Sequence, residues 1–297
     1  MRYVASLFIV IYHFNGEFFG DRPEILKVNH LLAAGVDLFF IISGFLMAMI
    51  VFSAQHSFGS YWKSRLLKIV PLYFVLTVFL YFADQHLDVF PNRILGLQEL
   101  LSSLTFSSLV LGLEGPILAV GWTLEYEMFF YFLVSIAVVL KTSPIVKVYF
   151  LSLTLLFLAQ FSGFPLLAEF IFGLLTYVVL HCWDNGTLHR NKFAFFLIAL
   201  CLAYLLGQGF ERPLYFGVPM LAVFLWSFRL NRTLEAPSFY NHSYEIYLFH
   251  LIIVKVYFSF IHASIGSYAL GIAFCLVSVG VACLCWMKVQ SLVGLVK

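Results

Sequence analysis

The sequence predicts an all-α, polytopic integral membrane protein with about ten transmembrane helices and both termini in the cytoplasm. Only 11% of the 297 residues are charged and 62% are apolar, against about 25% and about 45–50% in soluble domains. The mean hydropathy is +0.97. So few charges cannot cover a water-exposed surface, so we expect most of the outer surface to face lipid.

Apolar runs with short polar breaks fill the chain, which leaves no room for a soluble domain and predicts a single transmembrane domain over 1–297. The first run has no signal-peptide cleavage site after it and is taken as a helix. The stretch 93–113 mixes Leu with charged residues and Ser, which favours an interfacial helix. The expected spans are 2–19, 30–52, 66–83, 120–140, 145–161, 166–182, 193–209, 213–229, 240–261 and 267–287.

The distribution of Lys and Arg supports this count, because cytoplasmic loops of membrane proteins carry an excess of them. With ten alternating spans and a cytoplasmic N-terminus, twelve of the 17 Lys and Arg residues face the cytoplasm. The outer segments hold only Arg22, Lys27, Arg93 and Arg212, and Lys255 falls within a span. If a span in the middle of the chain had been missed, the Lys and Arg residues after it would change sides and the excess on the cytoplasmic side would be lost.

Composition also argues against two classes of ligand. The net charge is only +2 and the basic residues are scattered, so we expect a lipid bilayer and no nucleic acid as partner. The five cysteines form no CxxC pair, and no His lies at metal-ligand spacing from them, so we expect no metal site.

Ionisable groups inside a span cost several kcal/mol and by default mark a functional site. Arg2 and His13 lie eleven residues apart, almost three helical turns, so they share one face about 16 Å apart along the axis. Arg2 lies at the cytoplasmic end and His13 near the outer end. A structural histidine with satisfied hydrogen bonds is the alternative interpretation of His13.

Asp37 opens the second span from the outer side, at a depth similar to that of His13. Gly44 lies two turns further on the same face, where glycine permits close helix approach. Asp37 has two interpretations: an acid that complements the helix dipole, or a carboxylate that orients a neighbouring imidazole.

Arg65 and Lys68 lie three residues apart on one face, at the cytoplasmic start of the third span. They are either ordinary topology-setting charges or a clamp for phosphates that arrive from the cytoplasm.

Polar residues also mark the outer start of the fourth span. Thr123, Glu127 and Tyr131 share a face there, and Trp122 suits the membrane interface.

The ninth span carries a polar stripe at positions i, i+4 and i+7, namely Ser243, Tyr247 and His250. Such a stripe must face protein or a water-filled cavity, and it either lines a cavity or forms a structural hydrogen-bond seam.

These segments resemble, in order and spacing, the motifs of the acyltransferase-3 family of membrane acyltransferases. The resemblance rests on Arg2 and His13, GVDLFFIISGFL at 35–46, SRLLKIVPLY at 64–73, GWTLEYEMFFY at 121–131 and SYEIYLFH at 243–250. The fourth segment is most similar to the exopolysaccharide O-acetyltransferase branch. The resemblance implies a multi-pass enzyme of the bacterial inner membrane that takes an acyl group, usually acetyl, from cytoplasmic acyl-coenzyme A. The implied acceptor is a sugar hydroxyl of a polysaccharide or lipid-linked glycan at the outer side.

The resemblance also implies roles for individual residues. His13 becomes the essential histidine with Arg2 as its motif partner, and Arg65 and Lys68 hold the coenzyme phosphates. Glu127 matches the first acid of the family's W-S-L-x-x-E-E segment, whereas Met128 replaces the second.

On this basis His13 is the expected general base, oriented by Asp37. Direct transfer and a transient acyl-histidine are both open. The rival functions are a proton-coupled carrier or flippase and a non-catalytic subunit of a polysaccharide export system.

Overall fold

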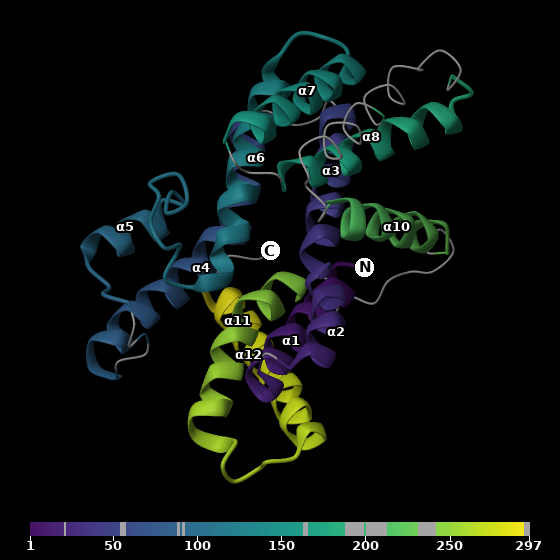
Figure 1. The fold of residues 1–297 in the computed structure, drawn as a ribbon. Coiled ribbons are helices and arrows are strands. Elements are labelled where there is room, and N and C mark those ends of the chain that lie inside the picture. The colour runs from purple at the N-terminus through teal and green to yellow at the C-terminus, as the bar shows by residue number, and fades with distance from the viewer. Residues whose placement is uncertain are drawn as a thin grey trace. The chain divides into compact units, whose positions relative to one another are not determined.

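The computed structural model describes residues 1–20, 22–53, 58–87, 90, 93–162, 166–187, 199, 213–230 and 242–293. All regular secondary structure in these ranges is helical (Figure 1), which confirms the all-α class. The helices are α1 (Arg2–Phe19), α2 (Pro23–Ala33), α3 (Gly35–Ser53), α4 (Phe58–Leu87), α5 (Leu97–Leu104), η1 (Ala119–Gly121), α6 (Trp122–Val139), α7 (Pro144–Ser162), α8 (Leu167–Asp184), η3 (Pro213–Gly217), α10 (Val218–Leu230), α11 (Ser243–Val256), η6 (Tyr257–Ile261) and α12 (Tyr268–Val293).

Six helical stretches of the described chain are long and apolar enough to cross a membrane. They are Val28–Ser53, Phe58–His86, Ala119–Val139, Leu167–Asp184, Ser243–Ile261 and Tyr268–Leu292, and each overlaps a predicted span. Two shorter apolar helices, Pro144–Gln160 and Tyr215–Phe228, overlap two more. The segment 2–19 forms α1, which is not among the six, and 193–209 lies outside the described residues except for 199. The count of ten and the cytoplasmic termini stay predictions.

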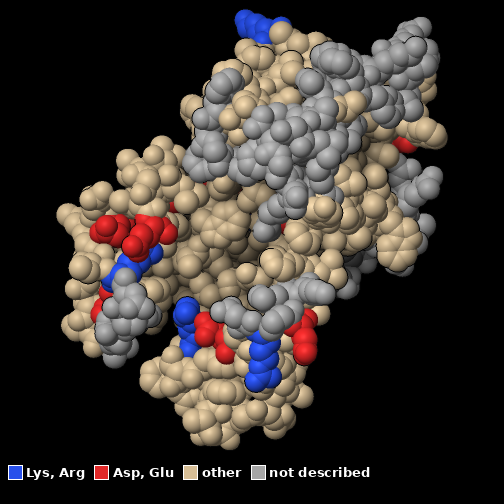
Figure 2. Space-filling view, viewed as in Figure 1, with Lys and Arg blue, Asp and Glu red and all other residues tan. Residues whose placement is uncertain are grey.

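The surface agrees with a membrane environment. Figure 2 shows a face on which Lys, Arg, Asp and Glu gather in a few small groups within a broad uncharged area. The short α5 shows the same preference, because Leu97 and Leu101 are exposed while Ser102 and Ser103 are buried. Apolar side chains that point outward and polar ones that point inward are expected where the surroundings are lipid.

The chain folds as two compact units. Unit 1 consists of Met1–Ala5, Ala33–Trp62 and Phe129–Pro237, and unit 2 of Ser6–Leu32, Lys63–Met128 and Ser238–Lys297. Four of the boundaries fall within α1, α2, α4 and α6.

In unit 1, α3 and α8 pack backbone against backbone (Figure 1). A Cβ atom on Gly44 would lie 2.2 Å from the carbonyl oxygen of Phe170, and one on Gly173 would lie 2.0 Å from that of Ile41. Only glycine fits at either position, as expected for Gly44 from the sequence. Close packing of this kind holds membrane helices together, since lipid supplies no hydrophobic force between them.

In unit 2, α1, α11 and α12 share a small buried cluster formed by Phe14, Val254, Tyr257 and Cys275. α1 and α11 run parallel, because the first contact joins their N-terminal ends and the later ones follow in the same direction. The Ser6 hydroxyl donates to the carbonyl oxygen of Ser243 at 2.8 Å. Three helical turns further on, Lys255 reaches Glu17.

We expect Gly44→Ala to destabilise the protein by about 1–3 kcal/mol, because the new methyl group meets a carbonyl oxygen rather than a movable side chain. Thermal unfolding in detergent, followed by circular dichroism, measures the change. The matched control is Gly280→Ala on α12, where a Cβ atom meets nothing within 4 Å. A melting temperature of Gly44→Ala equal to that of the control would contradict the close contact.

Candidate functional site

Two histidines from opposite ends of the chain meet between α1 and α11 in unit 2. The ring centroids of His13 and His250 lie 5.2 Å apart, with an angle of 39° between the ring planes. His13 is partly exposed and His250 is completely buried. Within the described part of the chain, neither ring nitrogen of His250 has a hydrogen-bond partner. The backbone carbonyl groups of Ile246 and Tyr247, about one turn earlier on α11, interact with the ring without meeting the geometry of a full hydrogen bond, so the ring keeps bonding capacity for a further group.

The polar stripe of α11 faces protein. Ser243, Tyr247 and His250 are all buried, and the Tyr247 ring lies 5.8 Å from that of His250. The hydroxyl groups of Tyr247 and Thr123 lie 2.8 Å apart, and Tyr247 donates to the carbonyl oxygen of Val120 at 3.1 Å. These bonds join the start of α6 to the middle of α11 and fix the residue one turn before His250.

The predicted basic pair lies on α4, close to a contact with α11. The hydroxyl of Tyr244 donates to the carbonyl oxygen of Ile69 at 2.6 Å. Arg65, one turn before Ile69, is partly buried, and Lys68 is exposed. His250 lies six residues beyond Tyr244, about 9 Å further along α11.

Glu125 anchors the loop that follows α5. Its carboxylate accepts hydrogen bonds from the backbone N–H groups of Ser108 and Leu109, at 3.0 Å and 2.8 Å. Arg93 holds the end of the same loop, since it donates to the carbonyl oxygens of Gly115 and Pro116. Glu125 had no role assigned from the sequence, and the structure shows it as a positioning residue.

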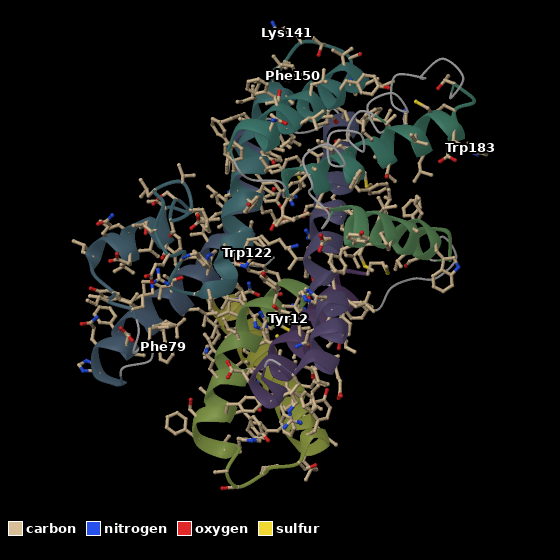
Figure 3. The ribbon with its side chains drawn as sticks, in the orientation of Figure 1. Tyr12, Phe79, Trp122, Lys141, Phe150 and Trp183 are labelled. Atoms are coloured by element: carbon tan, nitrogen blue, oxygen red, sulfur yellow. The ribbon has the colours of Figure 1, made fainter. Side chains whose placement is uncertain are left out.

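A groove of about 520 Å³ in unit 2 is lined by residues that follow the two histidines along α1 and α11. Its walls come from α4, which contributes Phe79 (Figure 3), from the segment Ile117–Ala119 and from α11. Glu17 and Lys255 are the only charged residues among the described residues that line it. They form an ion pair with an N–O distance of 3.3 Å.

The remaining predicted site residues divide between the units. In unit 1, Asp37 is completely buried in the first turn of α3, and Arg2 donates to the hydroxyl of Ser43 at 2.7 Å. Tyr131 is buried, and its carbonyl oxygen accepts from the hydroxyl of Tyr61. Because Asp37 and His13 belong to different units, their pairing stays a prediction.

In unit 2, Trp122 and Glu127 lie at the start of α6 and are partly exposed (Figure 3). Glu127 lies within electrostatic range of the Tyr247 hydroxyl. Within the described chain, no three His, Cys, Asp or Glu residues are grouped to hold a metal ion.

Two features were not expected from the sequence. Glu169 is completely buried in α8, and a Cβ atom on Gly217 would lie 2.4 Å from its carboxylate. The sequence feature that could have drawn attention to Glu169 is that it is an acidic residue within the predicted span 166–182. Nothing in the sequence predicted the pairing of Glu17 with Lys255, because 238 residues separate the two.

Comparisons with known proteins place the chain among acyltransferases. The family model described as an acyltransferase domain, acyltransferase 3, matches residues 1–287. The chain is 30% identical over 253 residues to the exopolysaccharide production protein ExoZ of Rhizobium meliloti (strain 1021). That alignment covers 75% of this chain and 77% of ExoZ. No solved structure is a significant match.

We expect Glu125→Gln to loosen the loop after α5, because an amide accepts at one oxygen only and turns an N–H₂ group toward the second backbone donor. Bonds to a charged acceptor contribute about 1.5–3 kcal/mol, so amide exchange at Ser108 and Leu109 should speed up by about 10- to 100-fold. Hydrogen exchange with mass analysis measures this, with Glu24→Gln on the exposed face of α2 as the control. Unchanged exchange in 105–113 would rule out the anchoring role.

Proposed function

The chain belongs to the acyltransferase-3 family, and from that membership we propose that it is a membrane O-acetyltransferase acting on an exopolysaccharide. In this proposal the donor is cytoplasmic acetyl-coenzyme A and the acceptor is a sugar hydroxyl at the outer side of the bacterial inner membrane. The likeness to ExoZ, by name an exopolysaccharide production protein, supports the class of acceptor. The pairing of His13 with His250 is the observation that carries the proposal.

The proposed reaction is direct transfer, with His13 as general base. As the sugar oxygen attacks the carbonyl carbon of the thioester, the imidazole of His13 takes the hydroxyl proton. The tetrahedral intermediate collapses, the carbon–sulfur bond breaks, and the sulfur leaves with the proton that His13 returns. The products are the acetylated sugar and coenzyme A. His13 suits this role because it is partly exposed and thus open to a substrate.

In the same proposal, His250 stabilises the negative charge that develops on the carbonyl oxygen. A neutral imidazole carries one N–H donor, and neither nitrogen of His250 has a partner within the described chain. A donor that is already in place, inside a site from which water is excluded, is worth far more than one in water. The bonds of Tyr247 to α6 hold this part of α11 in position.

The proposed donor site begins at the cytoplasmic end of unit 2, where Arg65 and Lys68 bind the phosphates of the coenzyme. In this proposal the extended pantetheine arm runs from this pair toward the histidines. Arg2 is a further proposed phosphate contact. Asp37 and Glu127 remain candidate carboxylates for orienting the catalytic groups, and Trp122, Tyr131 and Ser243 remain candidate substrate contacts.

We expect His13→Ala to lower kcat by about 10²- to 10⁴-fold, because the general base is lost. His250→Ala should lower kcat by about 10²- to 10³-fold, the usual effect of removing one oxyanion donor. Acetyl transfer from labelled acetyl-coenzyme A to the de-O-acetylated exopolysaccharide of the source strain measures both. His30→Ala on α2, an exposed histidine, is the control.

In cells, mass analysis of the surface polysaccharide should show loss of acetyl groups with the His13→Ala protein. If a stable, inserted His13→Ala protein still acetylates the glycan at the normal rate, the enzyme proposal is wrong. A carrier or a non-catalytic export subunit would give that result.

We expect Arg65→Ala to raise the KM for acetyl-coenzyme A by about tenfold or more, because a charge-assisted contact with phosphate contributes about 1.5–3 kcal/mol. Lys68→Arg should lower this KM, since a guanidinium binds phosphate through two parallel bonds. Initial rates at saturating glycan measure both effects. The control is Lys63→Ala, which replaces an exposed lysine on the same helix. An unchanged KM for acetyl-coenzyme A in Arg65→Ala would rule out the proposed role of Arg65 in phosphate binding.

A further inference from the structure

The ion pair between Glu17 and Lys255 needs an explanation other than stability. Its two side chains are 43% and 49% exposed, and exposed pairs of this kind add little to the stability of a fold. Charged residues within membrane helices are expensive and usually functional. Lys255 is also the one basic residue that the predicted topology leaves within a span.

The pair lies next to the two histidines. Glu17 follows His13 by one helical turn on the same face of α1, and Lys255 follows His250 by five residues on α11. Both charges lie within electrostatic range of His13. A molecule that contacts the pair therefore lies within one helical turn of the proposed general base.

The groove that the pair lines has the size and composition of a small-molecule site. Its volume of about 520 Å³ falls within the range of about 300–1,000 Å³ typical of ligand pockets. Apart from the pair, the lining is almost entirely apolar and includes Phe79, Phe90 and Phe258. Apolar and aromatic walls with a few placed polar groups are what such sites show.

Charge complementarity selects a sugar over a lipid tail as the occupant. A carboxylate accepts from hydroxyl groups and an ammonium donates to hydroxyl or ring oxygens, while aromatic rings pack against the C–H faces of a sugar. A hydrocarbon chain in the groove would remove water from both charges and return no hydrogen bond.

The groove is also held in shape and lies at the expected end of the helices. The loop that leads to Ile117–Ala119 is fixed by Glu125 and Arg93. In the predicted topology, the lining residues from α1, α4, the segment Ile117–Ala119 and α11 all lie toward the outer side, where the proposed acceptor is found. A rigid wall presents a ligand more accurately than a mobile loop does.

We propose that this groove is the glycan acceptor site, in which Glu17 and Lys255 bind hydroxyl groups of the sugar and present a neighbouring hydroxyl to His13. The inference rests on the proposed function and names where its acceptor binds. Glu17 and Lys255 are positioning residues and take no part in the proton transfer.

The test uses the full chain in lipid nanodiscs, with acetyl-coenzyme A as donor and de-O-acetylated oligosaccharides of the source strain's exopolysaccharide as the probe. Glu17→Gln and Lys255→Gln should each raise the KM for the oligosaccharide about tenfold. The KM for acetyl-coenzyme A should change less than twofold. Glu24→Gln is the control.

A charge-swapped double variant, Glu17→Lys with Lys255→Glu, separates binding from structure. The swap restores an ion pair but exchanges its donor and acceptor, so the KM for the oligosaccharide should stay high. Return of this KM to the wild-type value would show that the pair is merely structural and would overturn the inference.

A second variant, Ala83→Phe, fills the groove from α4. It should raise the KM for the oligosaccharide without raising that for acetyl-coenzyme A. A higher KM for acetyl-coenzyme A alone would mean that the donor binds in the groove. Unchanged values of both KM would mean that neither substrate binds there and that lipid fills the groove. Either result overturns the inference. A wild-type protein that transfers no acetyl group would refute the proposed function itself, whereas normal transfer with unchanged variants refutes only the acceptor site.

Discussion

The pairing of the two histidines in unit 2 depends on the parallel alignment of α1 and α11. The two helices touch through a hydrogen bond between Ser6 and Ser243, through the rings of His13 and His250, and through the ion pair of Glu17 with Lys255. Both helices rise 1.5 Å per residue, so the matching intervals along the two chains keep these contacts in one register. A slip of one turn would separate all three at once, which makes the pairing of the histidines a consequence of the register.

The helices around this pair position it through bonds to the backbone. Tyr244 and Tyr247 of α11 donate to carbonyl oxygens of α4 and of the segment before α6, respectively. Glu125 and Arg93 bind the backbone of the loop that forms one wall of the groove. Bonds of this kind fix side chains that are themselves not reactive, and they leave His250 with free hydrogen-bonding capacity among the described residues. The residues that hold the backbone and the histidines proposed to react are thus different side chains.

The sequence predicted some parts of this structure well and others not at all. Apolar runs predicted the all-α class and the positions of α1, α4, α6 and α8, because length and hydropathy are local properties. Helical spacing also predicted that Gly44 allows a close approach, and that the stripe of Ser243, Tyr247 and His250 faces protein or a cavity; the three residues are buried. Spacing fixes which face a residue occupies but not which helix covers that face. Asp37 was the expected neighbour of His13, and that pairing stays a prediction. The contact of His13 with His250, 237 residues further along the chain, was not expected. The role of Glu125 was equally hidden, because its partners are backbone groups of an irregular loop.

The distance in sequence between α1 and α11 has a consequence for biosynthesis. The ribosome delivers α1 to the membrane first and must add more than two hundred residues before α11 emerges. During that interval His13 and Glu17 lack the partners that α11 supplies, and polar groups without partners are unfavourable in hydrocarbon. The contacts between α1 and α11, and with them the pairing of the two histidines, therefore form only when synthesis is almost complete.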